Sequence, residues 1–326
     1  MIDVKIDMNK CTGCGYCVEL CSLSVFDLAN VNEKPMPKVA RPEDCCACLT
    51  CSGKCPESAI SIQQSAPQKR FVDDENLKPF VPISQDDLAR YKEYADDLDS
   101  ILKLRWKPVA VTLIPKGEPL PHVPVPRIRL RYCQALIMAR RGKQILMPGS
   151  SHSCPDGSSI LGMTKLPEKL ATGDIYYSLG KLATKEAARN LVHERPRLEE
   201  ESIQAVLVVP LEHAVMPPDV VVIMAPPETM MWLCMSSTFF SGKRMNFTMG
   251  SYNAQCLETT LYPYESGEIS LSLGCYGCRS ISDLSDDLMF MGIPQKKLEQ
   301  LMVGLKHLGK KAIPDARSKI YLPPLV

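Results

Sequence analysis

The chain has 326 residues, a length that allows two or three domains with a sizeable buried core. Aromatic residues make up 6% of it and form no stripe with basic side chains, so no pattern favours nucleic-acid binding. The first ten residues are polar and no apolar run reaches the ~20 residues that span a bilayer, so we expect neither a signal peptide nor a membrane span.

Fifteen cysteines in a chain without a secretory signal indicate metal or redox chemistry in a reducing compartment rather than disulfides. We therefore expect a cytoplasmic protein from an anaerobic setting. The formal net charge is only +1, but the basic excess falls after residue 100. That excess could attract an anionic small molecule or an acidic partner, although a solvated basic face is the simpler explanation.

Two copies of one cysteine spacing stand near the N-terminus. The first copy is Cys11, Cys14, Cys17 and Cys21, and the second is Cys45, Cys48, Cys51 and Cys55, followed by Pro56. Both have the spacing C-x2-C-x2-C-x3-C of bacterial iron–sulfur runs. A zinc site or a disulfide framework is the alternative, but zinc needs only four ligands and prefers paired C-x2-C knuckles. Eight cysteines in two such runs therefore favour iron–sulfur chemistry.

With these residues, the stretch from 1 to 64 resembles a bacterial-type two-cluster ferredoxin. The resemblance implies two [4Fe–4S] clusters, because in such ferredoxins the fourth cysteine of each run ligates the other cluster. The implied quartets are Cys11, Cys14, Cys17 and Cys55 for one cluster, and Cys45, Cys48, Cys51 and Cys21 for the other. Ser22, where proline is usual, and the extra thiol Cys46 depart from the family pattern without removing a ligand. We expect the side chain of Cys46 to point away from the cluster that Cys45 ligates.

The ferredoxin-like stretch should contain four short strands and two short helices that begin at the fourth cysteines. The strands are expected over residues 3–6, 25–26, 38–39 and 59–62. Pro35 and Pro37 are expected in the turn between the two halves. Residues 63–82 are polar and proline-containing, which is typical of a linker. A helix should follow over residues 84–102, with Ser84 as its N-cap and Asp87 at the third helical position.

A larger domain should begin with a strand at residues 109–114. Continuous apolar runs are typical of buried strands, and alternating ones of half-buried strands. Further strands are predicted over 144–147, 205–209, 220–224, 243–249 and 269–273, and helices over 132–141, over 229–240 and after Pro294. Because strands and helices interleave, the predicted class is α/β or mixed α+β, with a small two-fold ferredoxin-like domain and a larger α/β domain. The predicted boundaries are 1–64, 65–104 for the linker and amphipathic helix, and 105–326.

Several short motifs recur in the order typical of a second family. They include Tyr132-Cys133-Gln134-Ala135, Ser153-Cys154-Pro155, Cys256, and Gly274-Cys275-Tyr276-Gly277-Cys278-Arg279. Over residues 100–310 the chain is similar to the family called domain of unknown function 169. The resemblance implies a stand-alone globular unit of anaerobic prokaryotes, joined here to a ferredoxin, and it brings no established reaction.

Six cysteines lie outside the two runs. Cys234 stands in an apolar helix, where a free cysteine is usually a small core residue. Cys275 and Cys278 are flanked by glycines in a loop after a strand, where C-x2-C can bind a metal or a cluster, or cycle as a redox dithiol. A reduced pair without a function is the alternative.

Two thiols complete no metal site, so a second site would need partners. The expected cofactor-binding residues are Cys133, Cys154, Cys256, Cys275, Cys278 and Arg279, with His152 as a candidate nitrogen ligand. Arg279 could clamp an anionic group or hydrogen-bond a sulfide. Cys133, Cys154, Cys256 and His152 could each equally be an ordinary core or polar residue, whereas a function is favoured for the pair Cys275 and Cys278. Arg127, Arg129 and Arg131 could clamp an anionic group near Cys133, but they are more simply explained as the edge of a surface strand.

Dinucleotide, phosphate-loop, nucleophile-elbow and H-E-x-x-H motifs are all missing from the sequence, so nicotinamide use and ATP hydrolysis have no support. Two hypotheses follow. In the first, the protein is a redox subunit or oxidoreductase that passes electrons from two clusters to a third, cysteine-lined metal centre or cofactor. In the second, it is a non-catalytic accessory or assembly factor that docks on a redox partner protein or a larger oxidoreductase complex. No catalytic residue is assigned.

Overall fold

The computed structural model describes residues 2–31, 33–65, 80–247, 249–250 and 252–317. Its internal contacts divide the chain into two compact units. Unit 1 comprises Met1–Pro79, Ile114–Ala135 and Ile145–Val206, and unit 2 comprises Phe80–Leu113, Leu136–Gln144 and Leu207–Val326. The boundaries predicted at 64 and 104 stay a prediction. Most of the predicted linker falls on residues 66–79, outside the described residues.

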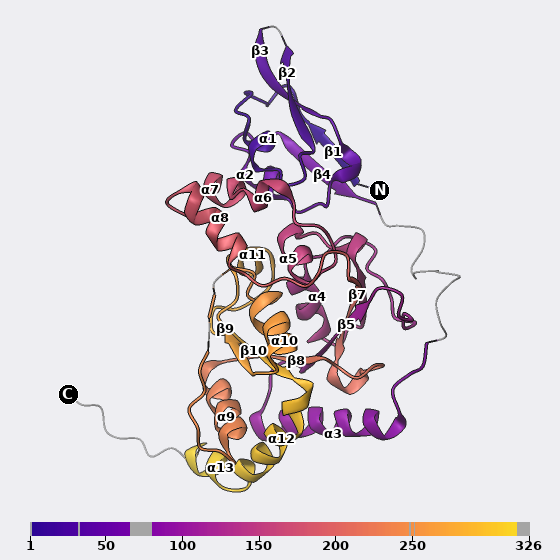
Figure 1. The fold of residues 1–326 in the computed structure, drawn as a ribbon, viewed down its shortest axis with the longest axis vertical. Helices are drawn as coiled ribbons and strands as arrows, with labels where there is room; N and C mark the ends of the chain where they lie inside the picture. The colour runs from indigo at the N-terminus through magenta and orange to yellow at the C-terminus, as the bar shows by residue number, and fades with distance from the viewer. Residues whose placement is uncertain (1, 32, 66–79, 248, 251, 318–326) are drawn as a thin grey trace, which may run out of the picture. The chain divides into compact units, whose positions relative to one another are not determined.

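The ferredoxin-like part of unit 1 has a two-fold arrangement of short elements (Figure 1). Strand β1 (Ile2–Ile6) pairs antiparallel with β4 (Ile60–Gln64), and β2 (Phe26–Val31) pairs antiparallel with β3 (Lys34–Val39). Helices α1 (Tyr16–Leu20) and α2 (Thr50–Lys54) contact each other. Apolar side chains and three cysteines share its small core, which consists of Val4, Cys17, Val25, Phe26, Cys45, Cys51 and Ile60.

Two details of this part differ from the prediction. The helices do not begin at the fourth cysteines but end just before them, with Cys21 and Cys55 as extended C-caps. Pro56 explains this at Cys55, since a residue before proline avoids the helical conformation. Pro35 and Pro37 lie within β3 rather than in a turn. Strand β3 pairs only with β2, so its other edge has no partner strand. Proline lacks an N–H and is tolerated where the backbone faces such an unpaired edge.

The rest of unit 1 is rich in short helices that hydrophobic periodicity does not reveal, because four to nine residues are too few to show it. They are α5 (Pro155–Ile160), α6 (Glu168–Ala171), α7 (Asp174–Ser178) and α8 (Lys185–His193), with the 3-10 turns η1 (Pro42–Asp44) and η2 (Gly149–Ser151). Helices α7 and α8 lie beside each other, and α7 also contacts α1 (Figure 1).

A six-stranded sheet has the strand order β6-β7-β5-β8-β10-β9. Its strands are β5 (Val109–Pro115), β6 (Ile145–Pro148), β7 (Ile203–Pro210), β8 (Val220–Ala225), β9 (Ser270–Ser272) and β10 (Met289–Pro294). Strand β8 pairs antiparallel with β5 and with β10, and all six of its residues are buried. The predicted continuous apolar strands are therefore confirmed, as is the mixed class of helix and strand.

Helices α3 (Gln85–Leu102), α9 (Pro227–Thr238) and α12 (Gln295–Lys310) pack together in unit 2 (Figure 1). Ser84 caps α3 as predicted, since its Oγ accepts the N–H of Asp87 at 3.1 Å. The remaining helical elements are α4 (Tyr132–Ala139), η3 (Leu211–His213), the π-helix η4 (Leu257–Leu261), α10 (Tyr262–Ser266), α11 (Tyr276–Ile281) and α13 (Ala312–Arg317). Among the described helices, none is both long and apolar enough to cross a membrane.

One predicted strand is wrong and one strand was not predicted. The described residues within 243–249 form no strand, because most of them are exposed and no sheet edge receives them. Strand β10 was missed because Gly292 and Pro294 read as turn residues. In the structure a side chain at Gly292 would stand 2.4 Å from the carbonyl oxygen of Thr259, so glycine allows the close approach of η4 to the sheet.

Asp219, just before β8, should make the stability of the protein pH-dependent. Burial raises the pKa of its carboxyl from 3.8 to about 6, and Oδ2 accepts the N–H of Leu113 at 2.8 Å. The protonated carboxyl therefore contributes its full share to the stability of the fold below pH 3.8. This stabilisation is lost as the pH rises through about 6. Asp219→Asn keeps an acceptor for Leu113, so at pH 7.5 it should raise the free energy of unfolding by about 1–2 kcal/mol.

Thermal unfolding of the holoprotein at pH 7.5 and pH 4 measures this effect. The melting temperature of Asp219→Asn should exceed that of the parent by about 2–5 °C at pH 7.5 and match it at pH 4. The exposed Asp96→Asn is the matched control and should change neither value. Equal melting temperatures of Asp219→Asn and the parent at both pH values would contradict the prediction.

Candidate iron–sulfur sites

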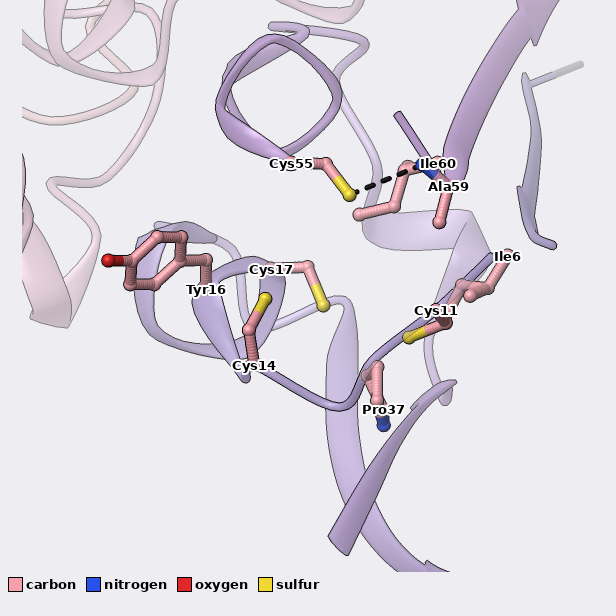
Figure 2. A pocket seen from close by; sticks show the side chains of 9 residues that line it. All are labelled: Ile6, Cys11, Cys14, Tyr16, Cys17, Pro37, Cys55, Ala59 and Ile60. Carbon is pink, nitrogen blue, oxygen red and sulfur yellow. Dashed lines mark hydrogen bonds between the residues drawn. The ribbon is translucent and has the colours of Figure 1, made fainter. Parts of the chain in front are cut away.

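Four cysteines line one pocket of the ferredoxin-like part. They are Cys11, Cys14, Cys17 and Cys55, and the pocket is completed by Ile6, Tyr16, Pro37, Ala59 and Ile60 (Figure 2). Cys55 ends the second run, yet it lines the pocket with the first three cysteines of the first run. Cys17 is buried, whereas Cys14 is exposed and stands two residues from the half-exposed ring of Tyr16. The pocket is thus walled by apolar side chains and reaches the surface at Cys14.

The loop between Cys11 and Cys17 depends on its glycines. Gly13 and Gly15 have φ values of 76° and 79°, in the left-handed region that side chains other than glycine rarely adopt. A Cβ at Gly13 would also stand 2.8 Å from the carbonyl oxygen of Pro35. Only glycine therefore lets this loop pass beside β3 and turn its cysteines toward one centre.

Backbone N–H groups donate to three of the candidate sulfurs. The N–H of Ala59 donates to Cys55 Sγ at 3.3 Å. The N–H of Val25 donates to Cys21 Sγ at 3.3 Å, and that of Ala47 to Cys45 Sγ at 3.4 Å. Such bonds stabilise thiolates and are one of the means by which a protein sets the potential of an iron–sulfur cluster.

The second set of cysteines interacts electrostatically. Burial is the main reason that the pKa values of Cys21, Cys45 and Cys51 are raised, to about 12 for Cys51. Repulsion among Cys21, Cys45, Cys48 and Cys51 adds to each of these shifts. Each thiolate is therefore costly while its neighbours are also thiolates and no cation is present.

The first set has the same character. Burial raises the pKa of Cys17 to about 11, and Cys11 and Cys14 add repulsion. A bound iron–sulfur cluster supplies cationic iron that holds all of its thiolate ligands ionised. Two sets of partly buried thiols that accept amide N–H bonds fit such a group. Among the described residues, no three His, Cys, Asp or Glu side chains gather as a site for a single metal ion.

Cys46 lies beside the second set of cysteines. Its buried thiol donates to the carbonyl oxygen of Ser153 at 3.9 Å. Its interaction with the sulfur of Cys48 is the first cause of a lowered pKa at Cys48, and the charge of Arg131 acts in the same direction. That Cys46 points away from the cluster ligated by Cys45 stays a prediction.

Other parts of unit 1 hold the two candidate sites in place. Arg131 Nη2 donates to the carbonyl oxygen of Cys48 at 2.7 Å. On the α1 side, Lys169 Nζ donates to the carbonyl oxygen of Val18 at 2.7 Å, and Ser178 Oγ donates to a carboxylate oxygen of Glu19 at 2.5 Å. Arg131 therefore has a specific contact that the sequence did not reveal, and the segment 127–131 forms no strand beyond an isolated bridge at Leu130.

The six residues expected in a second site fall into different units. Cys133 and Cys154 belong to unit 1, and Cys256, Cys275, Cys278 and Arg279 belong to unit 2. Cys133 is buried near the start of α4, and Cys256 is buried directly before the π-helix η4. Cys234 is half-buried on α9, and burial raises its pKa. The assignment of a common second site stays a prediction.

Cys154 and His152 form a small polar cluster in unit 1. Cys154 caps α5, where its sulfur accepts the N–H of Gly157 at 3.4 Å. The Nδ1 atom of His152 accepts the N–H of Cys154 at 3.0 Å, so the ring proton belongs on Nε2. Burial lowers the pKa of His152 to about 3, and the ring is therefore neutral. In this tautomer Nε2 is a donor and not a metal ligand.

A buried ion cluster beside Cys154 was not predicted. Tyr176 donates to Asp156 Oδ2 at 2.5 Å, and Arg195 pairs with the same oxygen at 3.0 Å. A third partner, Arg197, lies 3.6 Å from Asp156 Oδ1, and all three come from short helices or loops that follow Asp156 by twenty residues or more. No pattern in the sequence marks them as a set. Their burial indicates that the cluster fixes α5 against α7 and α8.

Arg279 is bound to the backbone around it. Its guanidinium donates to the carbonyl oxygens of Leu273 at 2.5 and 2.9 Å and of Leu288 at 2.8 Å. A further bond reaches Ser285 at 3.3 Å. Since these carbonyls take most of its donors, the geometry favours a bracing role for Arg279 over an anion clamp.

Comparisons with known proteins match both halves of the chain. Residues 97–304 match the family DUF169, described as "Uncharacterised ArCR", and residues 4–22 match the 4Fe-4S binding domain Fer4. An uncharacterized protein of Methanocaldococcus jannaschii is 27% identical over 224 residues, covering 68% of this chain and 96% of that protein. A ferredoxin of Methanothermococcus thermolithotrophicus is 36% identical over 63 residues, covering 19% of this chain and 98% of the ferredoxin. No solved structure matches the chain.

These matches confirm the two resemblances seen in the sequence. The relative from Methanocaldococcus jannaschii covers two thirds of the chain, and Ferredoxin-3 of Nostoc sp. is 34% identical over 71 residues, covering 18% of the chain and 73% of that protein. The N-terminal part is therefore a ferredoxin-like 4Fe-4S domain, whose chemistry is electron transfer.

Cys55→Ser should damage the cluster of Cys11, Cys14 and Cys17 rather than that of its own run. The reason is that Cys55 lines the pocket of those three cysteines (Figure 2). Iron analysis and EPR of the reduced protein, prepared anaerobically, should show one [4Fe–4S] signal altered or lost. Cys21→Ser is the matched variant and should affect the other signal. The interlocked assignment is wrong if both variants alter the same signal.

Arg131→Gln should lower the reduction potential of the cluster held by Cys45, Cys48 and Cys51. A positive charge near a cluster favours the reduced, more negative state, so its loss should lower the potential by an amount on the order of tens of millivolts. Potentiometric titration followed by EPR measures the two clusters separately. Arg127→Gln, in the exposed part of the same segment, is the control and should leave both potentials unchanged. An unaltered potential in Arg131→Gln would contradict the argument.

Proposed function

Because the chain belongs to the DUF169 family and carries a 4Fe-4S domain ahead of the family region, we propose that it is an iron–sulfur electron-transfer protein or redox subunit. Two [4Fe–4S] clusters pass low-potential electrons to a cysteine-lined centre or cofactor in the larger part of the chain. The ligands are Cys11, Cys14, Cys17 and Cys55 for the first cluster, and Cys21, Cys45, Cys48 and Cys51 for the second.

The observation that carries the proposal is the composition of the pocket in Figure 2. Three cysteines of one run and the last cysteine of the other line it together, as two-cluster ferredoxins require. The mutual repulsion of Cys21, Cys45, Cys48 and Cys51 supports a second quartet of the same kind. Each cluster supplies one-electron redox chemistry when it is bound.

The protein's own residues would set the energy of those electrons. The N–H groups of Val25, Ala47 and Ala59 donate to ligand sulfurs, and the charge of Arg131 lies beside Cys48. All four favour the more negative, reduced state of the neighbouring cluster. Burial of Cys17, Cys45 and Cys51 has the opposite effect, because it disfavours added negative charge.

The partner would be a redox protein that meets the first cluster at the surface. Cys14 is exposed, and Tyr16 beside it is 49% exposed, so this ligand is reachable by a partner and by solvent. Access of solvent to a low-potential cluster also makes it sensitive to dioxygen, which agrees with an anaerobic setting. Cytoplasmic localisation stays a prediction.

Anaerobic purification should yield eight iron and eight sulfide per chain, because two complete quartets of thiols are present. Chemical analysis of iron and sulfide together with EPR measures this. The double variant Cys11→Ser with Cys17→Ser should retain half of both, and Cys234→Ser, outside the quartets, should retain all. A zinc-containing protein, or full occupancy at four iron per chain, would exclude the two-cluster proposal.

A second measurement separates an electron carrier from an accessory factor. Dithionite is added to supply one electron per cluster, in the absence of any partner protein. The reoxidation of the clusters is then followed by absorbance. A route into the larger part predicts that electrons leave the clusters without a partner and that the variant Cys275→Ser with Cys278→Ser blocks this step. Stable reduced clusters in both proteins would favour the docking role on a larger redox enzyme.

A further inference from the structure

The loop from residue 274 to 278 in unit 2 holds two thiols in different environments. Cys275 is half-buried and caps α11, where its sulfur accepts the N–H of Cys278 at 3.3 Å. Cys278 is completely buried within the first turn of α11, and its sulfur lies 3.6 Å from Ser282 Oγ. One thiol, at the N-cap of this short helix, is thus accessible, and the other, in its first turn, is buried.

A buried cation lies near the inner thiol. Arg140 is 2% exposed, and its charge interacts with Cys278. It stacks on Trp106, with its guanidinium carbon 4.3 Å from the ring centroid, and Nη2 donates to the carbonyl oxygen of Asp283 at 2.8 Å. Its Nε has no hydrogen-bond partner in the described structure. Burial lowers the pKa of Arg140 to about 10, and the negative charges of the Asp283 carboxylate and of an ionised Cys278 oppose that shift.

The backbone of the loop is fixed on both sides of the thiols. Gly274 has a φ of 85°, and a side chain there would stand 3.0 Å from the ring of Phe290. The guanidinium of Arg279 ties the loop to the carbonyl oxygens of Leu273 and Leu288. The two thiols are therefore held at fixed positions, three residues apart, and do not depend on a metal to shape the loop.

The surface next to Cys275 is apolar. Leu273 is 53% exposed and Tyr276 is 58% exposed, one on each side of Cys275 in the sequence. A half-buried thiol between exposed apolar side chains can be approached by another molecule, whereas the buried thiol cannot. An accessible cysteine, a buried one three residues later and a nearby cation form the arrangement of a thiol–disulfide exchange site.

We infer that Cys275 and Cys278 form a reversible dithiol–disulfide couple that exchanges with disulfide-bearing molecules. In oxidation, the Cys275 thiolate attacks the disulfide of the other molecule, forms a mixed disulfide and releases one thiol. The Cys278 thiolate then attacks Cys275, closes the internal disulfide and releases the second thiol. Two protons leave Cys275 and Cys278, and the two released thiolates take them up, so atoms and electrons balance.

The reverse reaction needs two electrons and two protons to open the internal disulfide. Here the inference rests on the proposed function, because two one-electron clusters supply that pair of electrons. The couple would thus be the acceptor of the cluster electrons within the larger part of the chain. The exchange chemistry itself needs no cluster, so it can be tested independently.

The test uses the anaerobic holoprotein and 2-hydroxyethyl disulfide as the probe. After incubation, free thiols are alkylated, and peptide mass spectrometry reads the state of residues 275 and 278. The expected product is an internal disulfide between them, with iron content unchanged. Cys278→Ser should instead accumulate a mixed disulfide at Cys275, and Cys275→Ser should react at least about tenfold more slowly, because only the buried thiol remains.

Cys154→Ser is the matched control. Cys154 caps α5 as Cys275 caps α11, but Gly157 stands three residues after it instead of a cysteine. This variant should therefore form the internal disulfide as the parent does. Alkylated, unlinked Cys275 and Cys278 after incubation of the parent would overturn the inference, as would a mixed disulfide that the parent keeps without closing.

Arg140 is a positioning residue in this scheme, and its role has a separate readout. In the Cys275→Ser background, the pH at which Cys278 is half-alkylated should rise in Arg140→Met and return toward the parent value in Arg140→Lys. If Arg140 had only a structural role, Arg140→Lys would not restore the pH profile of Cys278 alkylation.

The proposed function and the exchange couple fail in different ways. If the disulfide closes with the probe but dithionite-reduced clusters do not reopen it, the couple stands and the electron route between clusters and couple is wrong. If the probe forms no disulfide between Cys275 and Cys278 although EPR shows complete clusters, the proposal of an exchange couple is wrong. The iron–sulfur proposal is then unaffected.

Discussion

The structure of the ferredoxin-like part depends on one electrostatic constraint: many thiols are held close together, and several of them are buried. Cys17, Cys45 and Cys51 belong to the apolar core itself. Without a cation, burial and mutual repulsion keep these thiols protonated. A bound cluster would hold the same thiols ionised as its ligands within this core. Metal binding and folding of this part are therefore coupled, as in other small metal-containing domains.

This constraint explains why the surrounding residues are donors. Backbone N–H groups face the sulfurs of Cys21, Cys45 and Cys55, and the thiol of Cys46 faces that of Cys48. Arg131, from the DUF169 region of the same unit, reaches the carbonyl oxygen of Cys48. The second set of cysteines is thus supported from two parts of the chain that are far apart in sequence. In the first set of cysteines, by contrast, Cys14 is exposed at the surface.

Asp156 and Arg140 are buried charged groups away from the candidate clusters, and their environments differ. Asp156 is paired with Arg195 in unit 1, and this ion pair fastens short helices together. Arg140 stacks on Trp106 in unit 2, and the charges of Asp283 and Cys278 act on it. We assign a structural role to the first group because its charges pair with each other, and chemistry to the second because its charge interacts with a thiol.

The sequence alone determined the iron–sulfur chemistry, because cysteine spacing is a local property that survives without knowledge of the fold. It also predicted the long or continuously apolar elements, such as α3, β8 and α12, whose periodicity covers enough residues to be read. Local signals were enough for the cap at Ser84, since the capping side chain and its partner are three residues apart.

Only the tertiary structure decided features that join distant residues. The bonds of Arg131 and Cys46, the ion cluster of Asp156 and the cation beside Cys278 each connect residues that no spacing rule relates. The tertiary structure also differed from the prediction for two short segments, one predicted as a strand and one not. The run at residues 243–249 finds no sheet edge, and β10 contains Gly292, which the close approach of η4 requires. A strand needs hydrogen-bond partners from elsewhere in the chain, and those partners are set by the whole fold.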